Sequence, residues 1–133
     1  MIQISYRVQH FDYSSTDLWE VTEQNAFKEF EKYTWSEEFS QYQENDDLKN
    51  CPPWMGFQKK WTKLTLLHFS PNKEKGKSLI NFYYPKDKDF LWLFKWSIGV
   101  NFSKLNVPDG EIAELIHLFF IEQYESLLKL LKN

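Results

Sequence analysis

The sequence predicts an α+β fold. We expect one small, mainly antiparallel sheet of about four strands, with an N-terminal helical section and a long C-terminal helix packed on it. Three observations support this: residues 2–8 alternate between apolar and polar, strand-like segments follow one another from residue 59 to 98, and the last segment repeats at helical spacing. The length of 133 residues suits a single domain over residues 1–133.

The N-terminal part gives one strand and two helical segments. The alternation over residues 2–8 predicts a half-buried strand, and turn-forming residues predict a loop over 10–16. Thr22 is a suitable N-cap for an amphipathic helix over residues 23–33, whose aromatic rings lie three positions apart. Acidic residues at the start of 36–42 predict a second, short helix.

The middle of the chain predicts a meander of strands. Residues 43–56 contain turn formers, two prolines and a glycine, and we interpret them as the main loop. Three strand candidates follow at 59–69, 78–84 and 90–98, with short turns between them that favour antiparallel neighbours. The last is almost entirely apolar, which predicts a central strand covered on both faces.

The C-terminal segment is the clearest helix. Asn106 or Asp109 can cap it, and Pro108 suits its first turn. Lysines near its end lie on the favourable side of the helix dipole. The apolar residues that repeat at helical spacing are Ile112, Leu115, Ile116, Phe119, Phe120, Leu127, Leu128 and Leu131.

Charge is distributed unevenly along the chain. Residues 1–50 hold eleven acidic and four basic residues, a net charge of −7, whereas residues 51–105 hold ten lysines and three acids, a net charge of +7. Residues 106–133 carry −3. Such asymmetry indicates either that parts of one fold attract each other or that one face suits a charged partner.

Cysteine content and hydropathy indicate the compartment. The single cysteine, Cys51, excludes an internal disulfide framework, which a small secreted domain usually has. The N-terminal residues lack the pattern of a signal peptide, and no apolar run approaches the roughly 20 residues of a membrane span. We therefore expect a cytoplasmic protein with no membrane contact.

Residue patterns that carry catalysis are not found in the sequence. It has no Gly-rich phosphate loop, no Gly-x-Ser-x-Gly elbow and no Cys-x-x-Cys pair. Glu114 and His117 have the i, i+3 spacing of carboxylate metal sites, but those sites need a second such pair. We expect no catalytic, cofactor-binding or metal-binding residues, and the protein is predicted not to be an enzyme.

Nucleic acid is a weak candidate partner. Ten lysines between residues 57 and 104 are interleaved with aromatic rings, a combination that can bind single strands. Arg7 is the sole arginine, however, and the net charge is −3, which argues against the basic patch of nucleic-acid-binding proteins.

The acidic section is the better indication of a partner surface. Carboxylates there are interspersed with aromatic rings, and aromatic anchors inside a polar rim are typical of protein interfaces. The predicted interface consists of Asp17, Glu20, Trp35, Glu37, Glu38, Tyr42, Glu44, Asp46 and Asp47. The alternative interpretation is that the rings form core and the acids are simply solvated.

In general build the chain resembles the small immunity proteins of bacterial polymorphic-toxin and contact-dependent growth inhibition systems. The resemblance lies in the acidic section at 19–42, the Pro-Pro-Trp-Met-Gly segment at 52–56 and the aromatic meander at 78–84 and 90–96. It implies a cytoplasmic protein without catalytic residues that neutralises a cognate toxin, such as a basic nuclease, by binding it.

Two alternatives remain open at this level. One is a small-ligand-binding or enzymatic domain with a pocket between the aromatic sheet and the C-terminal helix. The other is a structural or adaptor subunit that forms a homodimer through the aromatic sheet.

Overall fold

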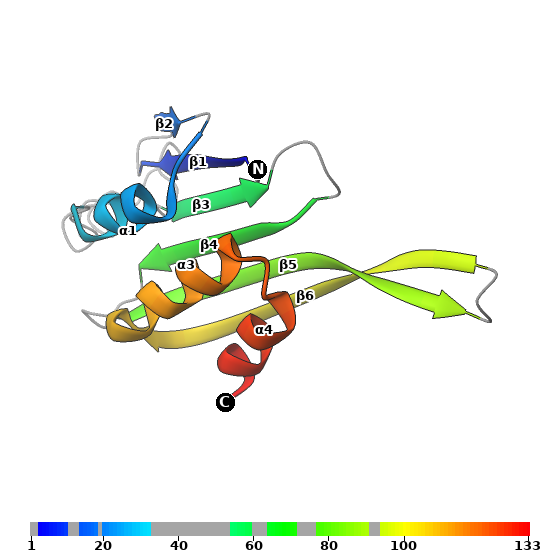
Figure 1. Cartoon of the computed structure of the whole chain (residues 1–133). Coiled ribbons are helices and arrows are strands. Elements are labelled where there is room, and N and C mark those ends of the chain that lie inside the picture. The colour runs from blue at the N-terminus through cyan, green and yellow to red at the C-terminus, as the bar shows by residue number, and fades with distance from the viewer. Residues whose placement is uncertain are drawn as a thin grey trace.

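The structure is a computed structural model that describes residues 3–10, 14–18, 20–32, 54–59, 64–71, 77–90 and 94–133. The described strands form one antiparallel sheet in the order β2-β1-β3-β4-β5-β6, and three α-helices accompany it in the part of the chain that the structure describes (Figure 1). The strands are β1 (Ile4–Gln9), β2 (Ser15–Leu18), β3 (Trp54–Lys59), β4 (Leu66–Pro71), β5 (Lys77–Phe90) and β6 (Phe94–Pro108). The helices are α1 (Glu23–Lys32), a 3₁₀ turn η1 (Asp109–Glu111), α3 (Ile112–Phe120) and α4 (Tyr124–Lys132).

The α+β class is confirmed, but the sheet has six strands where about four were expected. Part of the predicted loop at 10–16 belongs to β2, a short strand that pairs with β1. The expected strand at 59–69 is divided, because Lys59 ends β3 and Leu66 begins β4. Trp54, Met55 and Gly56, placed in the main loop by the sequence pattern, begin β3, which pairs with both β1 and β4.

β5 and β6 form a long ribbon that extends beyond the rest of the sheet (Figure 1). The last pair between β4 and β5 is Leu66 with Tyr83, so the ribbon continues past β4 to the pair of Phe90 with Phe94. The predicted central strand at 90–98 was wrong in its position, since β6 is an edge strand. The chain turns into helices after Pro108, and no described strand follows to pair with the outer side of β6.

The core lies between one face of the sheet and the helices, which all cover that same face (Figure 1). Alternate residues of the strands point into this layer, as the pleat requires. They meet the apolar stripes of α1, α3 and α4. The buried sheet residues are Ile4, Tyr6, Val8, Met55, Phe57, Leu67, Phe69, Ile80, Phe82, Tyr84 and Val107.

Two buried tyrosines join the sheet to helices through their hydroxyl groups. Tyr6 donates a hydrogen bond to Glu29 of α1 at 3.4 Å, and Tyr84 donates one to Glu125 of α4 at 3.0 Å. Burial, with the neighbouring carboxylate, raises the pKa of Tyr6, and the same causes raise the pKa of Tyr84 to about 12. Both rings therefore stay neutral at physiological pH.

The expected long C-terminal helix is broken into α3 and α4. Glu122 adopts a left-handed backbone with φ of 59°, and the amide of Gln123 donates to the carbonyl of Leu118 at 2.9 Å. Such a turn closes a helix and redirects the chain. A straight helix would be about 30 Å long, whereas the break lets the apolar residues of both pieces reach the sheet.

Helix capping is confirmed at one of the two expected places. The amide of Asn25 donates to the Thr22 hydroxyl at 3.3 Å, so Thr22 caps α1 as predicted. Asn106 and Asp109 do not cap the next helix directly, because β6 continues to Pro108 and η1 precedes α3. In the described part of the chain, no helix is both long enough and apolar enough to cross a bilayer.

Candidate functional site

We call the sheet face opposite α1, α3 and α4 the open face, because no described element packs on it. Its side chains are the strand residues that alternate with the core residues. They differ from the core in being small, polar or only partly buried. The open-face residues discussed below are Ser5, Arg7, Asp17, Trp54, Gly56, Gln58, Leu66, His68, Asn81, Tyr83, Asn101 and Ser103.

A row of residues crosses the open face from one edge to the other, with one member from each strand. The strand register places each member directly opposite the next. Directly opposed side chains lie about 5 Å apart, so they act as one continuous surface. This row, which we call the polar row, consists of Asp17, Arg7, Gly56, His68, Asn81 and Ser103.

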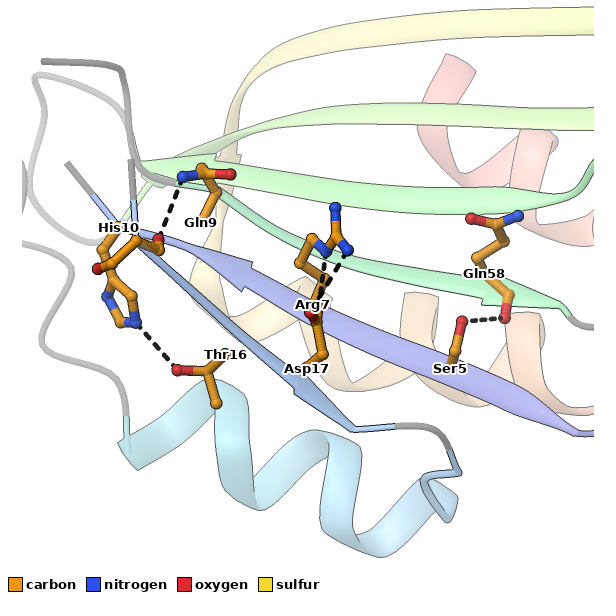
Figure 2. A network of polar contacts seen from close by, with 8 residues as sticks. Ser5, Arg7, Gln9, His10, Thr16, Asp17 and Gln58 are labelled. Atoms are coloured by element: carbon orange, nitrogen blue, oxygen red, sulfur yellow. Dashed lines mark hydrogen bonds and ion pairs between the residues drawn. The ribbon is translucent and has the colours of Figure 1, made fainter. Parts of the chain in front are cut away.

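An ion pair forms the β2 end of the polar row. Arg7 Nε donates to Asp17 Oδ1 at 2.5 Å, and Nη2 donates to Oδ2 at 3.4 Å, so the pair is bidentate (Figure 2). The Arg7 side chain is 56% exposed and the Asp17 side chain 43%. The carboxylate raises the pKa of Arg7 through its hydrogen bond and its charge. An exposed pair of this kind contributes little to stability but presents both charges to a partner.

An aromatic stack forms the middle of the open face. The rings of Trp54 and His68 lie 4.7 Å apart between centroids with an interplanar angle of 22°. They meet over Gly56, where a Cβ atom would lie 2.4 Å from His68 Cδ2 and 2.9 Å from Trp54 Cζ3. The glycine is therefore needed for the close approach of the two rings to the sheet.

Gly56→Ala is expected to lower the free energy of unfolding by about 1–3 kcal/mol, since both rings must move to admit the methyl group. Urea denaturation measures this change. The matched control is Gly110→Ala, where a Cβ atom would meet nothing within 4 Å. We expect the control to be neutral or slightly stabilising, and equal losses in the two variants would contradict this role of Gly56.

His68 is neutral in this environment. Burial lowers the pKa of the His68 imidazole below its usual range, because the charged form loses solvation. The uncharged ring can stack on the Trp54 indole and retains one donor and one acceptor nitrogen for a partner.

Stability is expected to fall on acidification because of His68. An unfolded histidine has a pKa of about 6.5, and the folded value is lower, so protonation below about pH 6.5 favours the unfolded chain. The loss develops as the pH falls through the unfolded pKa and ends below the folded one. We expect urea midpoints to decrease from about pH 7 to about pH 5, and His68→Phe to reduce that slope. An unchanged slope in the variant would contradict the assignment.

A hollow of about 330 Å³ lies on the open face beside the stack. Its lining combines the ion pair, the stack, a side-chain amide and an aliphatic side chain. The residues are Ser5, Tyr6, Arg7, Asp17, Trp54, Gly56, Gln58, Leu66 and His68. A surface of this composition can hold an apolar group against the rings and offer hydrogen bonds around it.

Further hydrogen bonds fix the strands around the hollow (Figure 2). Ser5 Oγ donates to the carbonyl oxygen of Gln58 at 3.3 Å, which joins β1 to β3. Gln9 Nε2 donates to the carbonyl oxygen of Ser14 at 3.1 Å, and His10 Nε2 lies 3.1 Å from Thr16 Oγ1. At the other end of the row, Ser103 donates to Asn81. These contacts join neighbouring strands of the sheet.

The structure describes two of the nine predicted interface residues. Asp17 lies on β2 and is bonded to Arg7, and Glu20 is exposed shortly before α1. The others lie outside the described residues: Trp35, Glu37, Glu38, Tyr42, Glu44, Asp46 and Asp47. The structure thus adds a second candidate surface, the open face, with Asp17 at its β2 edge.

Sequence reasoning missed Trp54, His68 and Gln58 as site residues. The Pro-Pro sequence before Trp54 and the glycine at 56 indicated a loop. The alternation of Trp54, Gly56 and Gln58 with Met55 and Phe57 was a signal for a strand with one apolar face, and the structure confirms that strand.

Glu114 and His117, the pair considered for metal binding, are both exposed on α3. His117 is exposed on α3, where its Nδ1 lies 2.5 Å from Glu23 Oε1 of α1, so it joins two helices. Cys51 is outside the described residues. Among the residues that the structure describes, no group of three or more His, Cys, Asp or Glu side chains could hold a metal ion.

The space between the sheet and the C-terminal helices is filled by side chains such as Phe82, Phe119 and Leu127, each at most 1% exposed. A second hollow, of about 280 Å³, lies where the turn between α3 and α4 meets β5. Glu125 lies there and accepts from Tyr84 and from Lys86, the latter at 3.0 Å. These bonds fasten α4 to the sheet.

Comparison with known proteins gives no relative. No protein-family model matches the chain, and the searches of curated proteins and of solved structures gave no significant match.

Proposed function

We propose that the chain is a non-enzymatic protein-binding inhibitor that recognises its partner through the open face. The observation that carries the proposal is the Trp54–His68 stack, partly buried beside the exposed Arg7–Asp17 pair. Binding energy in protein interfaces concentrates in aromatic and arginine side chains that become desolvated, with polar groups around them. In this proposal the Trp54–His68 stack is the buried anchor of the interface. The Arg7–Asp17 ion pair and Gln58 form its polar rim.

The specific form of this proposal is an immunity protein that neutralises a cognate toxin by direct contact. Support comes from the resemblance in general build and from the net charge of −7 over residues 1–50. Asp17 is paired with Arg7 at the edge of the open face, and the exposed Glu20, shortly before α1, adds a negative charge. A negative rim steers a basic partner and accelerates association at low salt.

The experiment is a tagged pull-down from the source cells at low and high salt, with bound proteins identified by mass spectrometry. We expect one stoichiometric partner, partly released at high salt because rim charges are screened. Expression of that partner alone should arrest growth, and co-expression of this chain should restore it. A partner whose activity is unaffected by the chain would contradict the inhibitor role.

A small-ligand-binding role is the second candidate. The hollow of about 330 Å³ is favourable for it, since ligand sites generally measure about 300–1,000 Å³. A thermal-shift screen distinguishes the two roles. Stabilisation by a small molecule, lost in Trp54→Ala, together with no protein partner at either salt, would favour the ligand.

A further inference from the structure

The two edges of the sheet differ in their capacity to accept another strand. The β2 edge has four residues, Ser15–Leu18, and carries Asp17, which pairs with Arg7 of the neighbouring β1. The β6 edge is much longer, and no described strand pairs with its outer side. Short, charged edges resist pairing, whereas long uncharged ones are templates for it.

The section of β6 available for pairing has definite ends. A register shift lies opposite Ser78 and Ile80, and Asn106 there has φ of 59°, so a bulge ends the regular strand after Lys104. Toward the hairpin turn, the ribbon twists away from the sheet body (Figure 1). Residues 101–104 remain as a regular edge that continues the sheet, and residues 98–100 extend it into the start of the ribbon past β4.

The available edge carries few charges. Ile98 is 41% exposed, Val100 and Phe102 are partly buried on the helix side, and Asn101 and Ser103 are exposed on the open face. Lys104 is the one charged residue from 98 to 104, and its Nζ donates to the carbonyl oxygen of Asn133 at 3.2 Å.

Helix α4 places charged side chains at both ends of this edge. Glu125 at its start bonds Tyr84 and Lys86, which are paired with Val100 and Ile98 of β6. Lys132 at its end lies over the Phe102 ring, with Nζ 6.0 Å from the centroid. The Glu125–Lys86 ion pair thus lies level with residues 98–100, and Lys132 and Lys104 lie level with 102–104.

We propose that β6 pairs with β6 of a second copy of the chain, antiparallel, with Asn101 opposite Asn101 on a two-fold axis. A two-fold axis perpendicular to the sheet keeps both sets of helices on one side. Charge favours this register, because with Asn101 on the axis the Lys104 and Lys132 end of one copy faces the Glu125–Lys86 ion pair of the other copy and not a second set of unpaired lysines. The helix dipoles of the two α4 helices are then antiparallel.

This register also places compatible side chains of the two copies opposite each other. Val100 lies opposite Phe102 of the second copy, twice by symmetry, and such β-branched and aromatic pairs stabilise sheets. Lys104 lies opposite Ile98 of the second copy, so the Lys104 side chains of the two copies stay apart. Exposed backbone groups of both edges gain hydrogen bonds. The dimer would be a continuous sheet of twelve strands with both open faces on one side.

The dimer goes beyond the proposed function and does not depend on it. Residues 98–104 of β6 lie at the opposite edge of the sheet from Arg7 and Asp17. The two proposals can therefore be tested separately. Dimerisation without a protein partner would support this one alone, and binding of a partner by a monomer would support the proposed function alone.

The test uses an engineered disulfide in a Cys51→Ser background. Thiols introduced by Asn101→Cys face each other across the axis, where directly opposed Cα atoms lie about 4.5–5.5 Å apart, within disulfide range. Thiols introduced by Ser103→Cys lie opposite Gly99 of the second copy, about 13 Å along the strand from each other. After mild oxidation, we expect covalent dimers from the first variant and monomers from the second. Equal cross-linking in both variants, or none in either, would contradict the register.

Light scattering against protein concentration completes the test. The wild-type chain should approach twice the mass of 16.2 kDa as its concentration rises. Asn101→Lys places like charges on the axis and should raise the dimer dissociation constant at least about tenfold, with an unchanged thermal midpoint for the monomer. Ser103→Lys, opposite Gly99, is the matched control and should remain dimeric. A wild-type monomer at every concentration would overturn the proposal.

Discussion

Trp54→Ala is expected to weaken binding of the protein partner by about 30-fold or more, equivalent to about 2 kcal/mol. Truncation removes the larger ring of the stack over Gly56 and leaves His68 without its neighbour. Because such anchors contribute mainly to the lifetime of a complex, most of the change should be in the dissociation rate. Calorimetry or surface plasmon resonance measures it.

The matched control for Trp54→Ala is Glu114→Gln. Glu114 is exposed on α3, on the opposite side of the molecule from the open face. Circular dichroism must show that both variants remain folded, and Trp54→Phe should retain part of the affinity because it keeps a ring. If Trp54→Ala binds like the wild type, or if Glu114→Gln weakens binding equally, the open face is not the interface.

Phe82→Ala is expected to lower the free energy of unfolding by about 3–5 kcal/mol. Phe82 lies on β5 with 0% exposure, its ring stacked on Tyr84 at 5.1 Å and 6.1 Å from the Tyr124 ring. Its loss leaves a cavity where the sheet meets α4, and rigid neighbours on two elements fill it poorly.

Urea denaturation measures the Phe82→Ala effect. The control is Leu64→Ala, because the Leu64 side chain is 47% exposed and should cost less than about 0.5 kcal/mol. A loss below about 1 kcal/mol for Phe82→Ala would mean that the core does not depend on this layer of rings.

Segments with a regular hydrophobic period were predicted well. The alternation of residues 2–8 correctly predicted β1. Thr22 and the aromatic spacing after it correctly predicted α1 and its cap. β2 was missed because Ser15, Thr16 and Asp17 contain no apolar alternation, and the strand exists through its pairing with β1.

Turn-forming residues gave wrong strand ends where the folded sheet tolerates them within a strand. Pro85 was expected to end a strand, but it lies within β5, opposite Gly99 and beyond the last pair with β4. β5 has a partner on one side only at that point, so a residue without an N–H is tolerated. The break at Glu122 lacks a glycine, and local sequence gave no sign of it.

The open face could not be predicted from the sequence, because it depends on register. Arg7, Gly56 and His68 are far apart in the chain and become neighbours only when β1, β3 and β4 pair in one particular alignment. A shift of one residue would send these side chains to the core. Composition identified the acidic section, and strand pairing places Asp17 opposite Arg7 at the edge of the open face.

The most direct test of the open-face interface is thiol protection in the complex with the captured partner. In a Cys51→Ser background, Gln58→Cys introduces a thiol on the exposed part of the open face, and Glu114→Cys introduces one on α3. We predict that partner binding slows maleimide modification at position 58 at least about tenfold, as expected for a desolvated interface, and leaves position 114 unchanged. Protection at position 114 with free reaction at 58 would contradict the account.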